Sequence, residues 1–498
     1  MVIWMKRISH IITANEVLRW SPGDIITITA GTGAGKSYFI KNILYDLCKQ
    51  NNKKILMLIH RINCVDQFRK EIEKDKKTDT IDIKTYQSLE NSAFFDFSEY
   101  EYIVNDEFHY FLGDAAFNIK TDISLDMILA QNDKKIIFMS ATGDYMKRYI
   151  NYIRKINTID YELPIEFKFI KSLTFFNKNE TLEKFIEEAI EKKDKGIFFI
   201  QSVEKAYNLY KKYENVCLFN CSKNNNKGFY KYVDQKKIAD MLQNEMFEEQ
   251  ILITTTCLDA GVNINDKNVK HVVLDVQDIG VLIQCLGRRR IQNDDDKINV
   301  YIKTITNQQL GGMETQLKNK IKKADYLRKH TVKEYLLEYP RAKSNDYSNI
   351  VYDDIVKEDD KGTKKINELM YFKCKFDLND IAEMKVYGEY GYCKYLQNLF
   401  KYEKDYRTIE EDYKSNDLEN YLASIKGQVM LQLKDREELI KKIDVKSNGK
   451  LLRKIYNLNG ALEEMEIPYR IIEFPTSKII NGKKKNYKSA WRVEQLVS

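Results

Sequence analysis

The chain has 498 residues, of which 43% are hydrophobic and 31% are charged, and its formal net charge is +7. A chain of this length is expected to form about two to four domains with ordinary hydrophobic cores. No apolar run approaches the ~18 residues of a membrane span, and the N-terminal residues MVIWMKRISH lack a signal-peptide core. We therefore expect a soluble, cytoplasmic protein with no membrane partner.

The first predicted element is a strand at residues 25–30, followed by a glycine-rich loop and a helix over residues 36–49. This order suits phosphate binding, because glycines let backbone N–H groups turn inward and the helix start adds its positive dipole end. In such a loop Lys36 reaches the phosphates and the Ser37 hydroxyl can hold Mg²⁺. The predicted nucleotide-binding residues are Ala30, Gly31, Thr32, Gly33, Ala34, Gly35, Lys36 and Ser37.

A second motif follows the apolar strand that ends near residue 105, where Asp106, Glu107, Phe108 and His109 stand in a row. Two adjacent acids at the carboxyl end of a strand are unfavourable unless they meet a cation. Asp106 can hold Mg²⁺, and Glu107 can orient and deprotonate the attacking water.

Strand and helix patterns alternate from residue 25 to about 160, and again from residue 196 to 303. Such alternation predicts parallel sheets with helices on both faces, and ligands bind at the carboxyl edges of such sheets. The predicted fold is two tandem doubly wound α/β lobes, residues 1–165 and 166–310, with the nucleotide in the cleft between them.

Charged helical patterns replace the alternation beyond residue 310, at residues 313–339, 378–402 and 407–443. A helix followed by a β-hairpin is predicted at the C-terminus, with lysines near the hairpin tip. Residues 421–498 contain sixteen Lys and Arg against nine Asp and Glu, an excess that equals the net charge of the whole chain. We expect a helical accessory region at 311–420 and a basic module at 421–498, which contacts nucleic acid, binds a protein partner or caps the helical region.

Seven segments together resemble, in order, the motifs of superfamily 2 helicases of the DExH-box type. They are AGTGAGKS, HRINCVDQ at 60–67, TYQSL at 85–89, DEFH, Ser140-Ala141-Thr142, TTTCLDAGVNI at 254–264 and QCLGRRR at 284–290. The resemblance covers about residues 24–305 and does not place the chain in a subfamily. It implies two RecA-like lobes, and ATP and Mg²⁺ as cofactors.

The resemblance also implies roles for residues by position. His109, Ser140 and Thr142 would couple the nucleotide state to contacts between the lobes, and Asp259 and Gly261 would link the nucleotide and strand sites. Gln284, Arg288 and Arg290 would face the γ-phosphate. Arg61, Thr85, Gln87, Thr254 and Thr255 would lie along the backbone of a nucleic-acid strand, where hydroxyl and guanidinium groups give positioning without sequence readout.

Two features depart from the family pattern. The last motif usually reads Q-x-x-G-R-x-x-R, but here the final arginine is Arg290, one residue early. If these arginines start a regular helix, Arg288 and Arg290 diverge by ~200°, so either the segment is not regular helix or only one arginine is a finger. We favour Arg288 as the finger, with Arg290 reaching the phosphate through an irregular turn, and replacing Arg289 should be mild. No glutamine precedes Gln50, so the adenine-reading glutamine of many relatives is missing and nucleobase preference stays open.

The function expected from these features is ATP-dependent movement along, or unwinding of, DNA or RNA, with single-stranded or partly duplex DNA favoured. Two alternatives stay open. One is a duplex translocase or remodelling subunit of a larger complex, and the other is a replication-loading subunit that uses ATP as a clamp.

Overall fold

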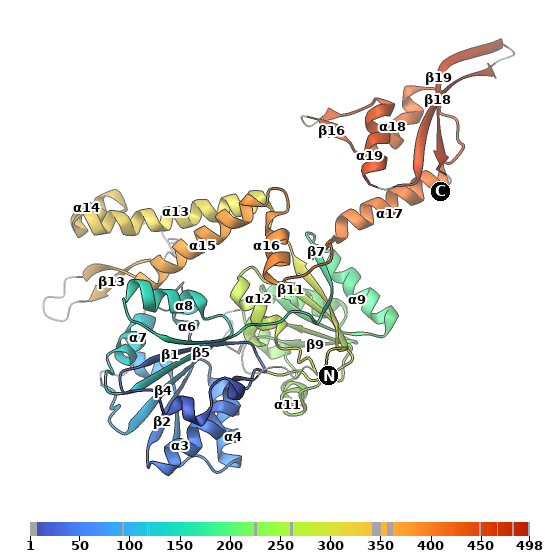
Figure 1. Cartoon of the computed structure of the whole chain (residues 1–498). Coiled ribbons are helices and arrows are strands. Elements are labelled where there is room, and N and C mark those ends of the chain that lie inside the picture. The colour runs from blue at the N-terminus through green and yellow to red at the C-terminus, as the bar shows by residue number, and fades with distance from the viewer. Residues whose placement is uncertain are drawn as a thin grey trace. The chain divides into compact units, whose positions relative to one another are not determined.

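The structure is a computed structural model (Figure 1). It describes residues 7–91, 94–116, 118, 120–223, 227–258, 262–340, 350–355, 362–447, 450–465, 467–480 and 483–496. The chain divides into two compact units. The first comprises residues 1–175 and 182–406, and the second comprises residues 176–181 and 407–498.

The first unit begins with a six-stranded parallel sheet in the order β3-β2-β4-β5-β1-β6. Its strands are β1 (Ile25–Ala30), β2 (Lys54–Ile59), β3 (Ile81–Thr85), β4 (Tyr100–Asp106), β5 (Lys135–Ser140) and β6 (Ile159–Leu163). The central strands read as continuous apolar runs because both faces of the sheet are covered.

Alternate residues of these strands enter two separate cores, as the two-residue period of a strand requires. Ile26 and Ile28 pack on one face with Phe39 and Leu44, whereas Ile25 packs on the other face in a core with other helices. The helices are α1 (Ala14–Val17), α2 (Lys36–Tyr38), α3 (Tyr45–Gln50), α4 (Ile62–Lys74), α5 (Tyr86–Glu90), α6 (Tyr110–Gly113), α7 (Thr121–Leu129) and α8 (Asp144–Arg148). A π-helical segment, Phe39–Leu44, joins α2 to α3.

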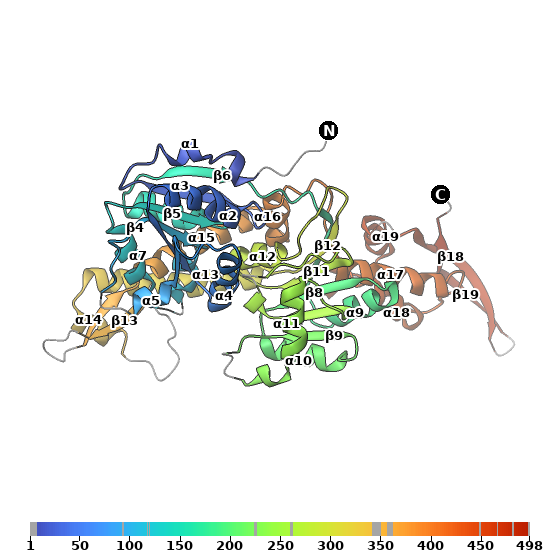
Figure 2. The ribbon, with the colours of Figure 1, turned by 90° about the horizontal axis from the view of Figure 1, so that it is seen from below.

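A second sheet follows, with β7 (Ile170–Phe176), β8 (Lys195–Ile200), β9 (Cys217–Asn220), β10 (Ile251–Thr254), β11 (Val269–Asp275) and β12 (Ile298–Lys303). These strands lie in the order β7-β12-β11-β8-β10-β9, and the pairs from β8 to β12 are parallel. Its helices are α9 (Thr181–Lys192), α10 (Val203–Lys212), α11 (Gln235–Asn244) and α12 (Ile279–Leu286). Figure 2 shows helices flanking both sheets. The predicted fold class, two tandem doubly wound lobes, is confirmed.

The helical region completes the first unit with α13 (Asn307–Lys329), α14 (Val332–Glu338), α15 (Glu368–Val386) and α16 (Gly391–Leu399). The helical region also contains an antiparallel pair that the sequence did not predict, β13 (Val351–Ile355) and β14 (Gly362–Ile366), because two adjacent charged residues interrupt the apolar pattern of each strand. In Figure 1, α13 and α15 run side by side.

The pair α13–α15 packs on both lobes. Leu369 and Cys374 of α15 belong to a core of the first lobe, whereas Ile381 and Met384 belong to the core of the second. The region predicted as an accessory therefore connects the two lobes within one compact unit.

The second unit contains β15 (Arg407–Thr408), α17 (Ile409–Ser424), α18 (Leu433–Ile443), β16 (Lys446–Ser447), β17 (Lys450–Leu451), α19 (Ile455–Glu464), β18 (Tyr469–Ile480) and β19 (Lys483–Gln495). Leu422, Leu439, Leu462 and Trp491 lie in one core. The predicted hairpin is present as β18–β19. The unit begins near residue 407 rather than 421, because α17 supplies Leu418 and Leu422 to this core.

The eight cysteines form no disulfide, and most of them are buried. Among the described residues no helix is long and apolar enough to cross a bilayer.

Candidate nucleotide and nucleic-acid site

The glycine-rich loop has the backbone shape that phosphate binding requires. Gly33 and Gly35 adopt φ values of 85° and 91°, which favour glycine. The loop leads directly into α2, so the unpaired N–H groups of the helix start face the loop. Lys36 Nζ bends back over the loop, donating to Ala30 O at 3.0 Å and lying 3.9 Å from Glu107 Oε1.

The two predicted acids lie at the end of β4, and Glu107 has a left-handed backbone with φ 52°. Burial opposes ionisation of Glu107, but Lys36, His109 and Arg288 together hold its pKa well below the ordinary range. Burial, and then the charge of Glu107, raises the pKa of Asp106. The pair therefore concentrates negative charge on Glu107 and leaves Asp106 in need of a cation.

Asp106 and Ser37 have the side-chain oxygens that a Mg²⁺ site requires. Asp106 Oδ1 is buried and accepts no hydrogen bond from any residue that the structure describes. The Ser37 hydroxyl lies exposed in the first turn of α2. Carboxylate and hydroxyl oxygens are hard ligands of the kind that Mg²⁺ binds, usually together with water and phosphate oxygens.

A chain of hydrogen bonds connects Glu107 to the second lobe. Ser140 Oγ donates to Glu107 Oε2 at 3.2 Å, and it lies 2.9 Å from His109 Nδ1. The other ring nitrogen, His109 Nε2, lies 2.8 Å from Gln284 Nε2. Since Ser140 Oγ already donates to the carboxylate, His109 Nδ1 must carry the proton and Nε2 must accept from Gln284.

Thr142 lies beside this chain. Its backbone N–H donates to Ser140 Oγ at 3.1 Å. Its hydroxyl Oγ1 is buried without a partner among the described residues. A Cβ on Gly280 of α12 would lie 3.9 Å from that oxygen, so Thr142 faces the helix that carries Gln284.

The three arginines of the last motif follow the end of a helix and do not start one, so of the two possibilities left open by the sequence the segment that is not regular helix is the one observed. Helix α12 ends at Leu286. The backbone then pairs with Ile264, whose N–H donates to Arg288 O and whose carbonyl accepts from Arg290 N, both at 2.9 Å. In this extended segment alternate side chains share a face, so Arg288 and Arg290 lie together and Arg289 points the other way.

Arg290 reaches the glycine-rich loop. A Cβ on Gly33 would lie 3.2 Å from Arg290 Nη1, and Arg290 Nε donates to Asn263 Oδ1 at 2.8 Å. Burial, and then the charge of Arg288, lowers the pKa of Arg290 to about 10. Arg288 donates to Gln284 O at 3.1 Å and to Val262 O at 3.4 Å.

Arg289 lies inside the second lobe. Its guanidinium pairs with both carboxylate oxygens of Asp296 at 2.9 and 2.6 Å, and its Nε donates to Val269 O. Its side chain is 0% exposed in this pair. Replacing Arg289 would therefore leave a buried carboxylate unpaired, which does not fit the expectation of a mild effect.

Thr32 forms a further contact between the loop and the last motif. Thr32 Oγ1 donates to Gly287 O at 3.2 Å. A Cβ on Gly287 would lie 2.3 Å from the same hydroxyl, so the close approach requires glycine at this position. The motif pattern indicated this glycine, but only the fold shows what it meets.

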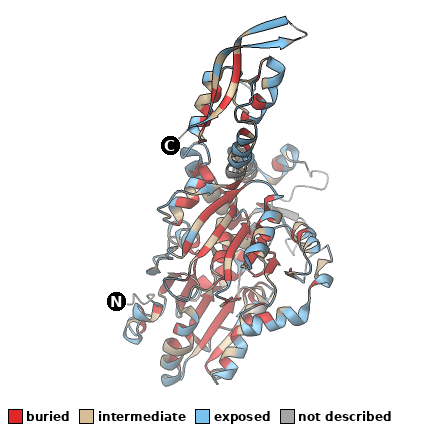
Figure 3. Ribbon diagram, turned by 90° about the vertical axis from the view of Figure 1, so that its right-hand side faces the viewer, coloured by how far each residue is buried: buried red, intermediate tan, exposed pale blue. Residues whose placement is uncertain are grey.

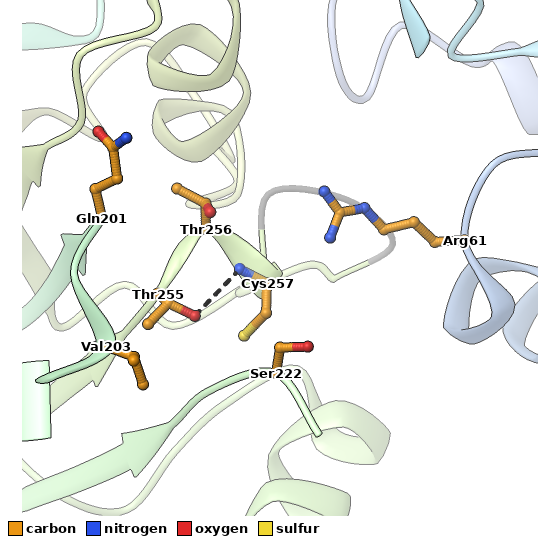
Figure 4. Close-up of a pocket in the computed structure, with 7 residues that line it drawn as sticks. All are labelled: Arg61, Gln201, Val203, Ser222, Thr255, Thr256 and Cys257. Carbon is orange, nitrogen blue, oxygen red and sulfur yellow. Dashed lines mark hydrogen bonds between the residues drawn. The ribbon is translucent and has the colours of Figure 1, made fainter. Parts of the chain in front are cut away.

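A cavity of about 210 Å³ lies between the two lobes of the first unit (Figure 4). Arg61, at the start of α4, enters it from the first lobe. Gln201, Val203, Ser222, Thr255, Thr256 and Cys257 line it from the second. The cavity therefore joins two of the five predicted strand-contact residues, Arg61 and Thr255. Sequence reasoning missed Gln201 and Ser222, because single polar residues after a strand carry no distinctive pattern.

The other three predicted strand-contact residues lie elsewhere. Thr85 caps α5 by accepting from Ser88 N, and Gln87 donates to Tyr110 OH at 3.2 Å. Thr254 is fully buried, and its hydroxyl donates to Thr255 O. Asp259 and Gly261 lie outside the described residues.

Comparison with known proteins gives similar folds only among solved structures. The chain is similar to Mss116p bound to ssRNA and AMP-PNP, with 15% identity, coverage of 58% of this chain and 67% of that chain, and a TM-score of 0.43. A DEAD box protein from the hyperthermophile Methanococcus jannaschii gives 18% identity, coverage of 57% and 82%, and a TM-score of 0.33. The chain is also similar to the DUF1998 helicase MrfA bound to DNA, with 15% identity, coverage of 58% of this chain and 45% of that chain, and a TM-score of 0.41. No protein-family model and no curated protein matches the chain.

Proposed function

We propose that this protein hydrolyses ATP, with Mg²⁺, in order to move along or unwind nucleic acid. The observation that carries the proposal is the contact zone between the lobes, where the glycine-rich loop, the acidic pair and the extended arginine segment meet. Gln284 reaches His109 at 2.8 Å, and Arg290 lies against Gly33. Groups that must act on one phosphate chain therefore come from both lobes.

Each group has a chemical role in this reaction. Ser37 and Asp106 would hold Mg²⁺, which neutralises phosphate charge when bound. Lys36 binds phosphate oxygens, and the Glu107 carboxylate, kept ionised by its neighbours, orients the attacking water and takes its proton. Arg288 and Arg290 share one face, from which they stabilise charge on the phosphoryl group in the transition state.

The chain of hydrogen bonds from Gln284 to Glu107 couples closure of the lobes to the orientation of the catalytic base. Gln284 holds His109 in the tautomer that donates to Ser140, and Ser140 orients Glu107. Opening of the lobes removes Gln284 from His109, so the orientation of the base depends on closure. Conformational closure that assembles a site in this way makes hydrolysis responsive to a second ligand.

Nucleic acid is the second ligand that the cavity between the lobes favours. Arg61 presents a cation and Thr255 and Ser222 present hydroxyls, all suited to phosphate oxygens rather than to base edges. A strand bound there would contact both lobes and favour the closed arrangement.

Steady-state hydrolysis tests the proposal. The ATPase rate of the full chain is measured alone and with single-stranded DNA, duplex DNA or RNA, with Glu107→Gln as the inactive control. We expect at least one polymer to raise the rate, and Arg61→Ala to weaken that stimulation more than the basal rate. A basal rate that depends on Glu107 but responds to no polymer would instead favour the clamp alternative.

A further inference from the structure

The second unit combines a pair of helices with a C-terminal antiparallel ribbon, as a winged helix-turn-helix module does. After helix α17, an isolated β-bridge joins Met430 to Trp491 through two hydrogen bonds of 2.9 Å. Helix α18, the short antiparallel pair β16–β17, helix α19 and the ribbon β18–β19 follow in that order. In helix-turn-helix modules the second helix of the pair lies in the major groove of DNA.

The ribbon extends well beyond the core that supports it. Tyr469, Ile471, Trp491 and Val493 anchor its base in the core. The distal ribbon, residues 475–480 and 483–488, has no residue in that core, and Figure 3 shows its far end exposed. An isolated two-stranded ribbon is marginally stable in water, so its retention calls for a role outside the core.

The charge of the distal ribbon points to a polyanion. Its five lysines, all exposed, are Lys478, Lys483, Lys484, Lys485 and Lys488. No acidic residue stands between Glu473 and Glu494. Lys478 lies directly opposite Lys485 across the ribbon, and like charges so placed repel each other. Binding to phosphates would relieve that repulsion.

Helix α19 presents an open outer face next to exposed basic residues. Leu458 and Leu462 are buried, and Asn459 fixes the helix to β18 by bonding both backbone groups of Ile471 at 3.0 and 2.8 Å. On the outer face Tyr456 is 87% exposed. Arg453 and Lys454, just before the helix, are also exposed.

Gly460 adds an independent argument on this outer face. Glycine inside a helix is less favourable than alanine by about 1 kcal/mol. A Cβ at Gly460 would meet no atom within 4 Å, so the packing of the unit does not require glycine there. A glycine of this kind suits the close approach of another surface to the backbone.

We propose that the outer face of α19 and the distal ribbon bind duplex DNA, with the helix in the major groove and the lysines on the phosphate backbone. The major groove is wide enough for one α-helix. This site shares no residue with the nucleotide site, so the protein binds duplex DNA there whether or not nucleotide is bound.

The ribbon is tested in the full chain by the triple variant K483A/K484A/K485A. Affinity for a short duplex DNA is measured by fluorescence anisotropy without nucleotide, over about 50–200 mM salt. Each lost phosphate contact should reduce the log–log salt slope by roughly 0.9, so we expect a decrease of about 2 to 3. The control K70A/K74A/K236A removes the same charge from exposed positions on α4 and α11 and should leave the slope unchanged. An unchanged slope in the ribbon variant overturns the proposal and favours a protein partner.

The helix is tested by Gly460→Gln, with Gly312→Gln as a matched control on an equally open glycine of α13. Both variants should melt at or above the wild-type temperature, because each replaces a helical glycine. Only Gly460→Gln should weaken duplex binding, by about tenfold or more, which corresponds to the ~1.4 kcal/mol of one lost groove contact. Wild-type duplex affinity in Gly460→Gln contradicts the groove assignment. The wild-type protein and both variants should bind single-stranded DNA. If none of the three proteins binds it, the result counts against the proposed function of the lobes and not against this site.

Discussion

Glu107 shows how local backbone strain and charge act together at one residue. Its left-handed φ of 52° is disfavoured for a residue with a side chain, and the structure keeps it where Lys36 and Ser140 meet the carboxylate. Such strain is retained where neighbouring contacts over-determine the position.

The first prediction separates binding from chemistry at this residue. Glu107→Gln removes the proton acceptor but keeps the shape, so we expect hydrolysis to fall by about 10²- to 10⁴-fold while ATP binding persists. Lys36→Ala should weaken ATP binding itself, since Lys36 acts on phosphates in the ground state. Titration with a fluorescent ATP analogue, beside steady-state rates, measures both effects. A wild-type hydrolysis rate in Glu107→Gln would contradict the assignment of Glu107 as the general base.

The second prediction separates the three arginines by their faces. Arg288→Ala and Arg290→Ala should each lower kcat by about 10²- to 10³-fold and leave the melting temperature nearly unchanged. Arg289→Ala should instead destabilise the protein by about 3 kcal/mol or more, because Asp296 would remain buried without its partner. Thermal melting and kinetics of the three variants decide the matter. A stable Arg289→Ala protein with a severe catalytic defect would show that the faces are reversed.

The third prediction concerns the contact between Thr32 and Gly287. Gly287→Ala places a methyl group 2.3 Å from Thr32 Oγ1, which should force the lobes apart and lower kcat. With Thr32→Ala added, the nearest remaining atom is Cβ of residue 32 at 3.3 Å, so the double variant should recover part of the rate. No recovery would mean that Gly287 serves another contact.

At the scale of elements, α15 connects the lobes through charged as well as apolar contacts. Lys373 reaches Asp278 at 3.5 Å and Asp377 at 3.1 Å. Burial opposes its charge, but the two carboxylates hold the pKa of Lys373 above its ordinary value. Asp278 also caps α12 by accepting from Val281 N at 2.9 Å. The helix that carries Gln284 is thereby tied to α15.

The fourth prediction tests this connection. Lys373→Met leaves Asp278 and Asp377 without their cation and should lower the free energy of unfolding by roughly 2 kcal/mol, the scale of a hydrogen bond to a charged group. Adding Asp377→Asn removes one orphaned charge and should restore part of the loss. Urea denaturation measures both. Equal stability of wild type and Lys373→Met would show that the apolar contacts of α15 suffice.

At the scale of the whole molecule, nucleotide hydrolysis and duplex binding are assigned to different units. Every described residue assigned to nucleotide chemistry lies in the first unit, whereas residues 421–498, in which Lys and Arg outnumber Asp and Glu by seven, belong to the second. Hydrolysis and duplex binding should therefore be separable.

The fifth prediction follows from this division. A chain ending at Tyr406 should keep its basal ATPase rate, lose affinity for duplex DNA and show a flatter salt dependence. The rate without polymer, the anisotropy titration and a melting curve measure these properties. A truncated chain that is folded but has lost basal hydrolysis would show that the second unit contributes to the nucleotide site.

The sequence by itself determined the features that depend on local order. The glycine-rich loop, the acids at the end of β4 and the alternating strands were predictable, because strand period, turn chemistry and adjacency act over a few residues. The terminal hairpin was predictable for the same reason.

Only the tertiary structure decided which of these residues meet. The arginine spacing left open whether the segment is regular helix, and only the pairing with Ile264 makes it extended and decides which arginines share a face. Tertiary packing also decided the partners of three other residues: Asn263 meets Arg290, Asp296 meets Arg289, and Gly287 meets Thr32. The connection of both lobes by α15 and the open face of α19 likewise depend on packing between segments far apart in the chain, which no local pattern encodes.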